Sequence, residues 1–468
     1  MIAVQREHRT IKRLLGFSSR DGVACKMMRQ TFSSPLRSRS AAGFTLVEIM
    51  VAIVLGLLLT FGILQLFDGT SRTNKLQNGL ARLQENGRYA VARIDADLRM
   101  LGAQRCSNYT GNATTSADRT PIWASRSMVS YVTSLPFPDS STGTLGGGSP
   151  YRIDPSLFVQ GYECSSGCSI PALGAYANES LAVDQRVPNS DVLTIRYQSG
   201  TGWPVKVFDA ATAVANDCGT NGDEIVDGTV IPLINQTGDD AAPSSTPAAV
   251  VISSCMGSVV LPVSGMSGPG PDQPPASFTV GGSLLAGAPS TMCKGSAVTE
   301  IRAFDWSDFV TVSYFLVFRE NMDPDAGIRD LVPTLVRRVN GGPAEDVVQG
   351  VDQLELRYGV LDSNGTTRYM TADEVDAADV ALCTAAPEGL VNSSGCLWRD
   401  VRAVEVHLLV NSTDQIHNLD AISRSFVFQG VTTNVAADGS TTLASGQVAG
   451  SMLRREFVTQ VMVRNRNP

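Results

Sequence analysis

The stretch FTLVEIMVAIVLGLLLTFGILQLF, residues 44–67, decides the fold of this 468-residue chain. It is 24 residues long and carries a single charged side chain, that of Glu48. As an α-helix it would be about 36 Å long, and the hydrocarbon core of a bilayer is about 30 Å thick. The sequence therefore predicts a transmembrane helix over residues 44–67.

The charges before and after this stretch differ in sign. Residues 1–43 contain nine Lys or Arg and two acidic residues, while the whole chain has a net charge of −8, so the remainder carries −15. Basic residues stay on the cytoplasmic side of a membrane, which predicts that the acidic body is exported. A body without a basic excess is not expected to bind nucleic acid.

Helical periodicity continues beyond the apolar stretch, over residues 68–102. Apolar residues recur there at steps of three and four, which is typical of a helix that packs one face on a globular body. Gly87 lies on this stripe and should weaken it locally, and Gly102 is a candidate C-terminal cap. We therefore expect one long helix, apolar all round in its first half and amphipathic in its second. The stripe consists of Leu76, Leu80, Leu83, Ala90, Ile94, Leu98 and Leu101.

The exported body is expected to be rich in β-strands. Residues 103–298 contain Gly-, Ser- and Pro-rich loop sequences between short apolar runs, which predicts an irregular β-rich region to which we assign no chemistry. In residues 403–410 of the C-terminal region, four aliphatic side chains share one face, while Glu405 and His407 share the other. Such alternation is typical of antiparallel strands with one buried face. The longest strand-like runs of region 299–468 are 309–318, 334–339, 354–360, 403–410 and 457–465.

These elements predict an α+β fold. A long N-terminal α-helix, with an apolar first half, would pack on a β-rich, mainly antiparallel head with long loops.

The junction in front of the helix, Gly43-Phe44-Thr45-Leu46-Val47-Glu48, resembles the class III signal of type IV prepilins and of type II secretion pseudopilins. The resemblance implies that a prepilin peptidase removes the basic leader, residues 1–43, by cutting after Gly43. It also implies N-methylation of the new terminal residue, Phe44. A leader of 43 residues is long for such proteins, so Met27 and Met28 remain alternatives to Met1 as the start.

Glu48 would lie about 6 Å from Phe44 along the helix axis. A carboxylate at the centre of a bilayer costs roughly 2.5–3.5 kcal/mol on insertion scales, so it needs a partner. Cleavage after Gly43 creates one, the α-amine of Phe44, on the same chain or on a neighbouring subunit. Pairing between subunits would set the axial register of otherwise uniform apolar helices. The alternative is that Glu48 lies near the interface and extends into the lipid headgroups.

Residues 82–102, RLQENGRYAVARIDADLRMLG, resemble the PilW family of minor type IV pilins, and the strands of residues 299–468 resemble that family less specifically. The resemblance implies a structural protein with a single inner-membrane span, a cytoplasmic N-terminus and a periplasmic body. That protein would then enter a surface pilus, at the tip or in its initiation complex, and support pilus assembly, adhesion and twitching motility. The implied partners are prepilin peptidase, the other minor pilins, the major pilin and the large pilus-tip adhesin.

Two other functions remain open from the sequence. A minor pseudopilin of the J type in type II secretion has the same signal, although such heads are usually much shorter than the 425 residues left after cleavage. A single-span anchored periplasmic binding protein or enzyme would keep its leader and gather polar residues in a pocket.

Eight cysteines follow the leader, and Cys25 lies within it. An even number in an exported, loop-rich chain is typical of disulfides, but the count does not give the pairing. The pairs nearest in sequence are Cys164–Cys168 and Cys383–Cys396. No second Cys or His pair lies near Cys164 and Cys168, so a zinc site is not expected. If both pairs form, the remaining candidates are Cys106, Cys218, Cys255 and Cys293.

Motifs for catalysis or for a cofactor are missing from the sequence. No lysine follows a glycine as in a P-loop, and Gly-x-Ser-x-Gly does not occur, so we expect neither a cofactor nor enzymatic activity. Asp362-Ser363-Asn364-Gly365 resembles the start of a calcium loop, which makes Asp362 and Asn364 weak candidate ligands. Asn-Gly between strand-like runs is more often a type I′ hairpin turn, which we predict here.

Overall fold

The computed structural model of the chain describes residues 45–463, apart from internal gaps. The chain divides into two compact units, Met1–Leu66 and Phe67–Pro468. The gaps are residues 103–127, 138–143, 147–148, 165–169, 171–172, 174–175, 177, 206–223, 226–227, 234–244, 255–256, 268–276, 283, 286–287, 290–300, 321–330, 387–389 and 417–418.

Helix α1, Leu46–Met100, is the long helix that the sequence predicts. It ends before Gly102, whose φ of +64° is the left-handed conformation that glycine adopts readily. The amide of Gly102 donates a hydrogen bond of 3.1 Å to the carbonyl of Arg196, so the chain is attached to a strand as soon as it leaves the helix. The buried residues of α1 all lie in its second half, as its amphipathic pattern predicts: Gly79, Leu83, Gly87, Ala90, Ile94, Asp97 and Leu98.

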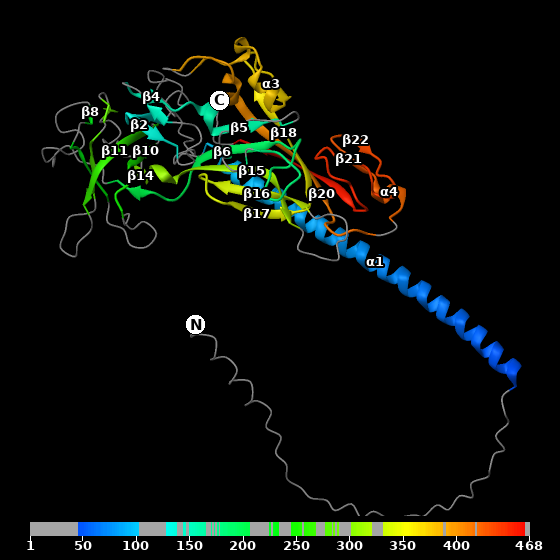
Figure 1. The fold of residues 1–468 in the computed structure, drawn as a ribbon. Coiled ribbons are helices and arrows are strands. Elements are labelled where there is room, and N and C mark those ends of the chain that lie inside the picture. The colour runs from blue at the N-terminus through cyan, green and yellow to red at the C-terminus, as the bar shows by residue number, and fades with distance from the viewer. Residues whose placement is uncertain are drawn as a thin grey trace, which may run out of the picture. The chain divides into compact units, whose positions relative to one another are not determined.

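A four-stranded antiparallel sheet contains much of the C-terminal sequence, in the order β19-β18-β20-β23. Its two central strands, β18 and β20, are labelled in Figure 1. In β20, Val404 and Val406 are buried while Glu405 and His407 are partly exposed on the other face, which confirms the alternation expected for residues 403–410. The strands are β18 (Val351–Leu361), β19 (Thr367–Met370), β20 (Val401–Asn411) and β23 (Arg454–Met462).

A five-stranded antiparallel sheet has the order β17-β16-β15-β6-β5. It joins strands from both sides of residue 298, because β6 pairs with β15. Its strands are β5 (Val159–Tyr162), β6 (Val192–Gln198), β15 (Phe309–Glu320), β16 (Leu331–Val339) and β17 (Ala344–Gln349).

An eight-stranded sheet is built mostly from residues before 298. Strands β1 and β11 run parallel and the other pairs antiparallel, so the head is mainly antiparallel, as predicted. Its strands are β1 (Met128–Ser130), β4 (Tyr151–Arg152), β7 (Trp203–Pro204), β9 (Val230–Pro232), β10 (Ala249–Ser254), β11 (Gly257–Ser267), β12 (Ser277–Val280) and β14 (Arg302–Asp305).

Smaller elements complete the described head. Three strand pairs are β2 (Ser134–Pro136) with β3 (Thr144–Gly146), β8 (Glu224–Ile225) with β13 (Ala288–Pro289), and β21 (Phe426–Phe428) with β22 (Val431–Thr433). The short helices are α3 (Ala372–Asp376), α4 (Ala421–Arg424), and the 3₁₀ turns η1 (Pro155–Phe158), η4 (Trp306–Asp308), η5 (Val380–Leu382) and η6 (Cys396–Asp400).

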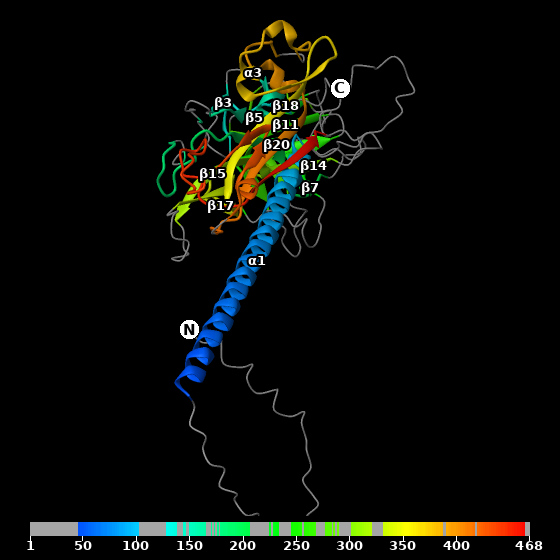
Figure 2. The ribbon, with the colours of Figure 1, turned by 90° about the vertical axis from the view of Figure 1, so that its right-hand side faces the viewer.

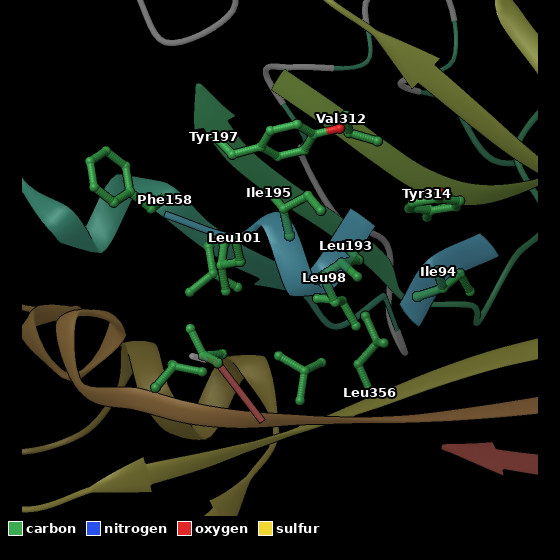
Figure 3. Close-up of a cluster of buried hydrophobic side chains, with 14 of the residues drawn as sticks. Ile94, Leu98, Leu101, Phe158, Leu193, Ile195, Tyr197, Val312, Tyr314 and Leu356 are labelled. Carbon is green, nitrogen blue, oxygen red and sulfur yellow. The ribbon is translucent and has the colours of Figure 1, made fainter. Parts of the chain in front are cut away.

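The largest hydrophobic core encloses the C-terminal end of α1. Ile94 and Leu98 of the helix lie between Ile195 of the five-stranded sheet and Leu356 of the four-stranded sheet (Figure 3). Figure 2 shows the same end of α1 running in among the strands. The end of α1 therefore lies between the two sheets and shares one hydrophobic core with both of them. This is why the second half of the helix needs an apolar face in addition to its polar one.

The buried stripe differs from the predicted one at Leu76, which is only partly buried, and at Leu80. The expectation for Leu80 is wrong, since its side chain is 41% exposed. Gly79 is buried instead. It lies close against the head, since a Cβ added at this position would be 3.2 Å from Ile416 Cδ1 and 3.4 Å from Ser412 Cβ. At this level the helix approaches the head through backbone rather than through a leucine side chain.

Candidate assembly and docking site

The first half of α1 is unburied apolar surface. Every residue of Leu46–Leu66 is exposed. Within the described part of the chain, α1 is the one helix that is long and apolar enough to cross a membrane. Soluble monomers rarely expose apolar surface of this extent, so the segment requires lipid or an apolar assembly around it.

Glu48 closes the first turn of α1. Its Oε2 accepts hydrogen bonds from the backbone amide of Thr45 at 3.1 Å and from the Thr45 hydroxyl at 3.2 Å. The amide of Glu48 in turn donates to Thr45 Oγ1 at 3.2 Å. This reciprocal pair is a capping box, with Thr at the N-cap and Glu three residues later. The carboxylate is therefore held at the start of the helix, while Gly43 and Phe44 lie outside the described residues.

Gly87 lets the second half of α1 approach strand β23. A Cβ at this position would lie 2.3 Å from the ring of Phe457, so the ring occupies the space that a side chain would need. Gly87 itself is buried. We expected Gly87 to weaken the packing of the apolar stripe at this point, and that expectation is wrong. The ring of Phe457 packs in the space that a side chain at residue 87 would fill.

Asp97 is a carboxylate buried in the contact between helix and head, with 5% of its surface exposed. Its Oδ2 accepts hydrogen bonds from Arg337 Nε at 2.7 Å and from the Tyr314 hydroxyl at 2.5 Å. Its Oδ1 accepts one from the Tyr197 hydroxyl at 3.1 Å. These donors lie on β6, β15 and β16, three neighbouring strands of the five-stranded sheet. The cluster therefore fixes both the axial position and the rotation of α1 against that sheet.

The charges in this cluster are matched. Burial raises the pKa of Asp97, but the hydrogen bonds from Arg337 and Tyr314 and the charge of Arg337 outweigh it and bring the pKa below the ordinary 3.8. Burial and the Asp97 carboxylate raise the pKa of Tyr197 to about 12 and that of Tyr314 above its usual range. At neutral pH the cluster thus contains one anion, one cation and two neutral phenols.

Asp191 is a second buried carboxylate, and it links β6 to β18. Its amide donates to the carbonyl of Leu354 at 2.9 Å, and its Oδ2 accepts from the amide of Leu356 at 2.8 Å. Burial and the nearby Glu355 carboxylate raise its pKa from 3.8 to about 8. Asp191 is therefore mostly protonated at neutral pH and bridges the two sheets as a neutral group.

Cys383 and Cys396 form a disulfide, with their Cα atoms 6.0 Å apart. This is one of the two pairs nearest in sequence. Arg399 holds the loop they close, because its Nη1 donates to Asn392 at 2.8 Å and its Nη2 to Asp154 at 2.6 Å. Cys164 is also disulfide-bonded. The other candidates, Cys106, Cys168, Cys218, Cys255 and Cys293, lie outside the described residues.

Asp362 and Asn364 belong to a hairpin loop between β18 and β19. Asp362 Oδ1 accepts from the amides of Asn364 and Thr366, both at 2.9 Å. Among residues 362–366, Gly365 alone has a positive φ, whereas a type I′ turn needs two such residues. The hairpin is confirmed and the predicted turn type is wrong. In the described part of the chain, no group of three or more Asp, Glu, His or Cys side chains could hold a metal ion.

Two family models match the chain. Residues 38–64 match the prokaryotic N-terminal methylation motif, which includes the Gly43 junction and most of the apolar half of α1. Residues 314–465 match type IV pilus-assembly protein W, a range that includes β16 to β23. No match was found among curated proteins or among solved structures.

A methylation motif followed by an apolar helix and a β-rich head defines a type IV pilus-related pilin. Within this class, the two matched segments are those of a PilW-family minor pilin, which confirms the resemblance seen at residues 43–48 and in the C-terminal strands. Such segments point to a structural protein, and the motif implies processing by prepilin peptidase and assembly with other pilins. The apolar helix α1 fits an inner-membrane anchor.

Sequence reasoning missed Thr45, Asp97 and Asp191. Thr45 and Glu48 have the Thr-x-x-Glu spacing of a capping box, which is a recognisable signal. Asp97 lies next to Leu98 on the buried stripe, where a carboxylate indicates a buried partner. The sequence does not indicate which residues pair with Asp97, because Tyr197 and Arg337 lie 100 and 240 residues away from it.

Proposed function

We propose that this protein is a minor pilin of the type IV pilus. In this proposal prepilin peptidase cuts after Gly43, Phe44 is N-methylated, and the mature chain enters the pilus at or near its tip. The observation that carries the proposal is the methylation-motif junction directly in front of a capped helix whose first half, Leu46–Leu66, is entirely exposed. A plain anchor would need the apolar length but neither the Gly-Phe junction nor an acid in the first turn.

Glu48 has the role of assembly charge in this proposal. Its capping bonds use Oε2, and Oε1 takes part in none of the hydrogen bonds of the described residues. A carboxylate oxygen can accept further bonds, so the α-amine of Phe44 on a neighbouring subunit could bind Oε1 while the cap stays formed. In apolar surroundings such a charge pair is much stronger than in water. It would set the axial register between helices that are otherwise uniformly apolar.

The docked half of α1 would serve assembly by fixing the head on its helix. Asp97 contacts Arg337 on β16, and Gly87 contacts Phe457 on β23. These two contacts allow one rotation of the helix against the strands, so every subunit would present its head in the same orientation about the helix axis. The head that remains after cleavage is part of a 425-residue mature chain, which is difficult to repeat along a shaft and favours the tip.

The proposed route begins in the inner membrane, with the N-terminus cytoplasmic and the body periplasmic, and ends on the cell surface. There the protein would contact the other minor pilins, the major pilin and the large pilus-tip adhesin, and it would support pilus assembly, adhesion and twitching motility. The regions of the chain would then be a leader (1–43), a filament-core half of the helix (44–67), a docking half (68–102) and two β-rich regions (103–298 and 299–468).

Two substitutions test the proposal in cells. Gly43→Trp should leave the leader attached, because a bulky residue replaces the glycine at the scissile bond. Glu48→Ala should permit cleavage but reduce the amount of protein in sheared filaments. Glu85→Ala is the matched control, since Glu85 is an exposed acid further along α1. Immunoblots of whole cells and of sheared filaments measure both effects. Normal filament content in both variants would refute the assignment, and loss of protein secretion with normal pili would indicate a pseudopilin.

A further inference from the structure

A loop of the head, residues 411–416, contacts α1 where the helix first becomes buried, and we call this loop the clasp. Gly79 is the first buried residue of α1. A Cβ added there would lie 3.2 Å from Ile416 Cδ1 and 3.4 Å from Ser412 Cβ, so the backbone of the helix itself lies against the clasp. Ser412 is 1% exposed at this contact. The side chain of Ser412 therefore becomes accessible only when the contact opens.

The turn of α1 at the clasp is held less firmly than the turns that follow it. Residues 67–78 are exposed or only partly buried. The ion pair between Arg82 and Asp414 has side-chain exposures of 64% and 51%, and exposed pairs contribute little to stability. Gly79 also lowers the intrinsic stability of the helix at this turn. From Leu83 onward the helix is anchored in the main hydrophobic core, so a bend near the clasp would break few contacts.

The clasp contains a residue in a strained backbone conformation. Thr413 has a φ of +58°, in the left-handed region that β-branched residues rarely adopt. Its amide donates to Asn411 Oδ1 at 2.7 Å. Its Cγ2 lies close to the backbone of Gly350, where an added Cβ would be 2.7 Å from it. Such a conformation costs free energy and persists only where the surrounding structure holds it in place.

Backbone hydrogen bonds attach both ends of the clasp to the head. The amide of Ser412 donates to the carbonyl of Leu453 at 3.0 Å, and the amide of Ile416 donates to the carbonyl of Ser451 at 2.7 Å. Neither bond involves α1, so the clasp remains on the head when the helix moves. Residues 413–415 lie between these two bonds, and the strain can relax there once the helix has left.

We propose that the clasp is a releasable joint between helix and head. In this proposal α1 bends near Gly79 and leaves the clasp, while residues 83–100 stay docked, and the head thereby changes its angle to the helix when the subunit enters the filament. The contacts of Asp97 and of Phe457 lie outside the clasp and keep the docked part in place. Relaxation of Thr413 favours the release. The proposal deepens the proposed function and rests on it for the filament.

The labelling rate of a cysteine at position 412 tests the release on the full-length chain in detergent micelles. Ser412→Cys places a thiol in the buried contact, iodoacetamide reacts with it when the contact opens, and mass spectrometry of the labelled peptide gives the rate. In this background Thr413→Asn should slow labelling at least roughly fivefold, because asparagine adopts the left-handed conformation more readily and release then relieves less strain.

A bulky residue at the contact should have the opposite effect. In the same background Gly79→Leu should speed labelling at least roughly fivefold, because the new side chain would overlap Ile416 and keep the helix off the clasp. Gly69→Leu is the matched control. Nothing lies within 4 Å of a Cβ at residue 69, so this variant should leave the rate within about twofold. An unchanged rate in Gly79→Leu would overturn the proposal, because the helix would then not be what covers position 412.

Asp97→Asn distinguishes release at the clasp from unfolding of the whole head. The substitution weakens the docked part of α1 and leaves the clasp intact, so local release predicts a labelling rate within about twofold of the unsubstituted background. A rate that rises as much as the unfolding constant would show that the thiol is exposed only by global unfolding, and would overturn the proposal. An unchanged rate in Thr413→Asn would overturn it as well, even if Gly79→Leu failed to fold.

A disulfide across the contact tests the role of release in assembly. The Cβ atoms at positions 79 and 412 would be 3.4 Å apart, close to the separation found in disulfides. In cells the cross-linked form of Gly79→Cys/Ser412→Cys should still be cleaved after Gly43 but should be at least roughly fivefold less abundant in sheared filaments than either single variant. Equal abundance would overturn the proposal. The labelling experiment needs no filaments, so this inference and the proposed function fail in different experiments.

Discussion

Asp97→Asn removes the negative charge from the buried contact between helix and head while keeping the size of the side chain. The change leaves the guanidinium of Arg337, whose side chain is 12% exposed, without its counterion. Removing one partner of a buried ion pair costs about 3–5 kcal/mol. The two tyrosine hydroxyls donate to different oxygens of Asp97 and the amide has a single oxygen, so one of these hydrogen bonds is lost as well, and we expect a loss within that range, about 3–5 kcal/mol.

Asp95→Asn is the matched control for this variant. Asp95 lies two residues earlier on α1 and pairs with Arg99 at 2.7 Å, the N–O distance found for Asp97 and Arg337. Its pair is exposed, with side-chain exposures of 51% for Arg99 and 25% for Asp95. Such pairs one helical turn apart contribute about 0.3–0.5 kcal/mol. The two variants therefore compare one chemical change in a buried and in an exposed setting.

Urea unfolding followed by tryptophan fluorescence measures both variants, because Trp306 and Trp398 lie in the core that α1 completes. The pKa of Asp97 lies below 3.8, so the contribution of its charge is present at neutral pH and disappears as the pH falls through the pKa of the folded state. The difference between the native chain and Asp97→Asn should shrink accordingly in acid. A loss below about 1 kcal/mol at pH 7, or equal losses in the two variants, would refute the buried-pair reasoning.

Three further changes follow from the same structure. Because the pKa of Asp191 is raised from 3.8 to about 8, its contribution to stability is full below pH 3.8 and is lost as the pH rises toward 8. Asp191→Asn should therefore flatten the decline of Tm over this range and stabilise the head at pH 8 by at most about 5 kcal/mol; a variant with the native slope would contradict this. Gly87→Leu should cost about 1–3 kcal/mol in thermal unfolding because of the clash with Phe457. Gly69→Ala, with nothing within 4 Å of the new Cβ, should gain about 0.5–1 kcal/mol; an unchanged Tm for Gly87→Leu would show that the contact is loose. Replacing both Cys383 and Cys396 by Ser should cost about 3 kcal/mol, and dithiothreitol should lower the Tm of the native chain by more than that of the double variant, which keeps the disulfide of Cys164.

The helix could be predicted from the sequence because its determinants are local. Apolar periodicity placed it over residues 44–102, and the structure has it over Leu46–Met100. Thr45 caps one end and Gly102 the other, and both residue types favour these positions by themselves. The candidate assembly residues Gly43, Phe44 and Glu48 likewise form a short local motif.

The arrangement of the head could not be predicted in the same way. β6 pairs with β15 more than 100 residues away, and no local pattern encodes such a choice. β23 occupies Arg454–Met462 rather than the predicted run 457–465, because the charge of Arg454 is neutralised by Asp352 at 2.8 Å and can be buried inside a strand. The Asp97 cluster was missed for the same reason, since its buried charge is acceptable only once Arg337 is in place.

The most direct test of the whole account is the N-terminus of the protein recovered from sheared surface filaments. Edman degradation or mass spectrometry of the first peptide should find N-methylphenylalanine at residue 44, followed by Thr45 and Leu46. Recovery of the chain with residues of the leader still attached, from cells that process their major pilin normally, would contradict it.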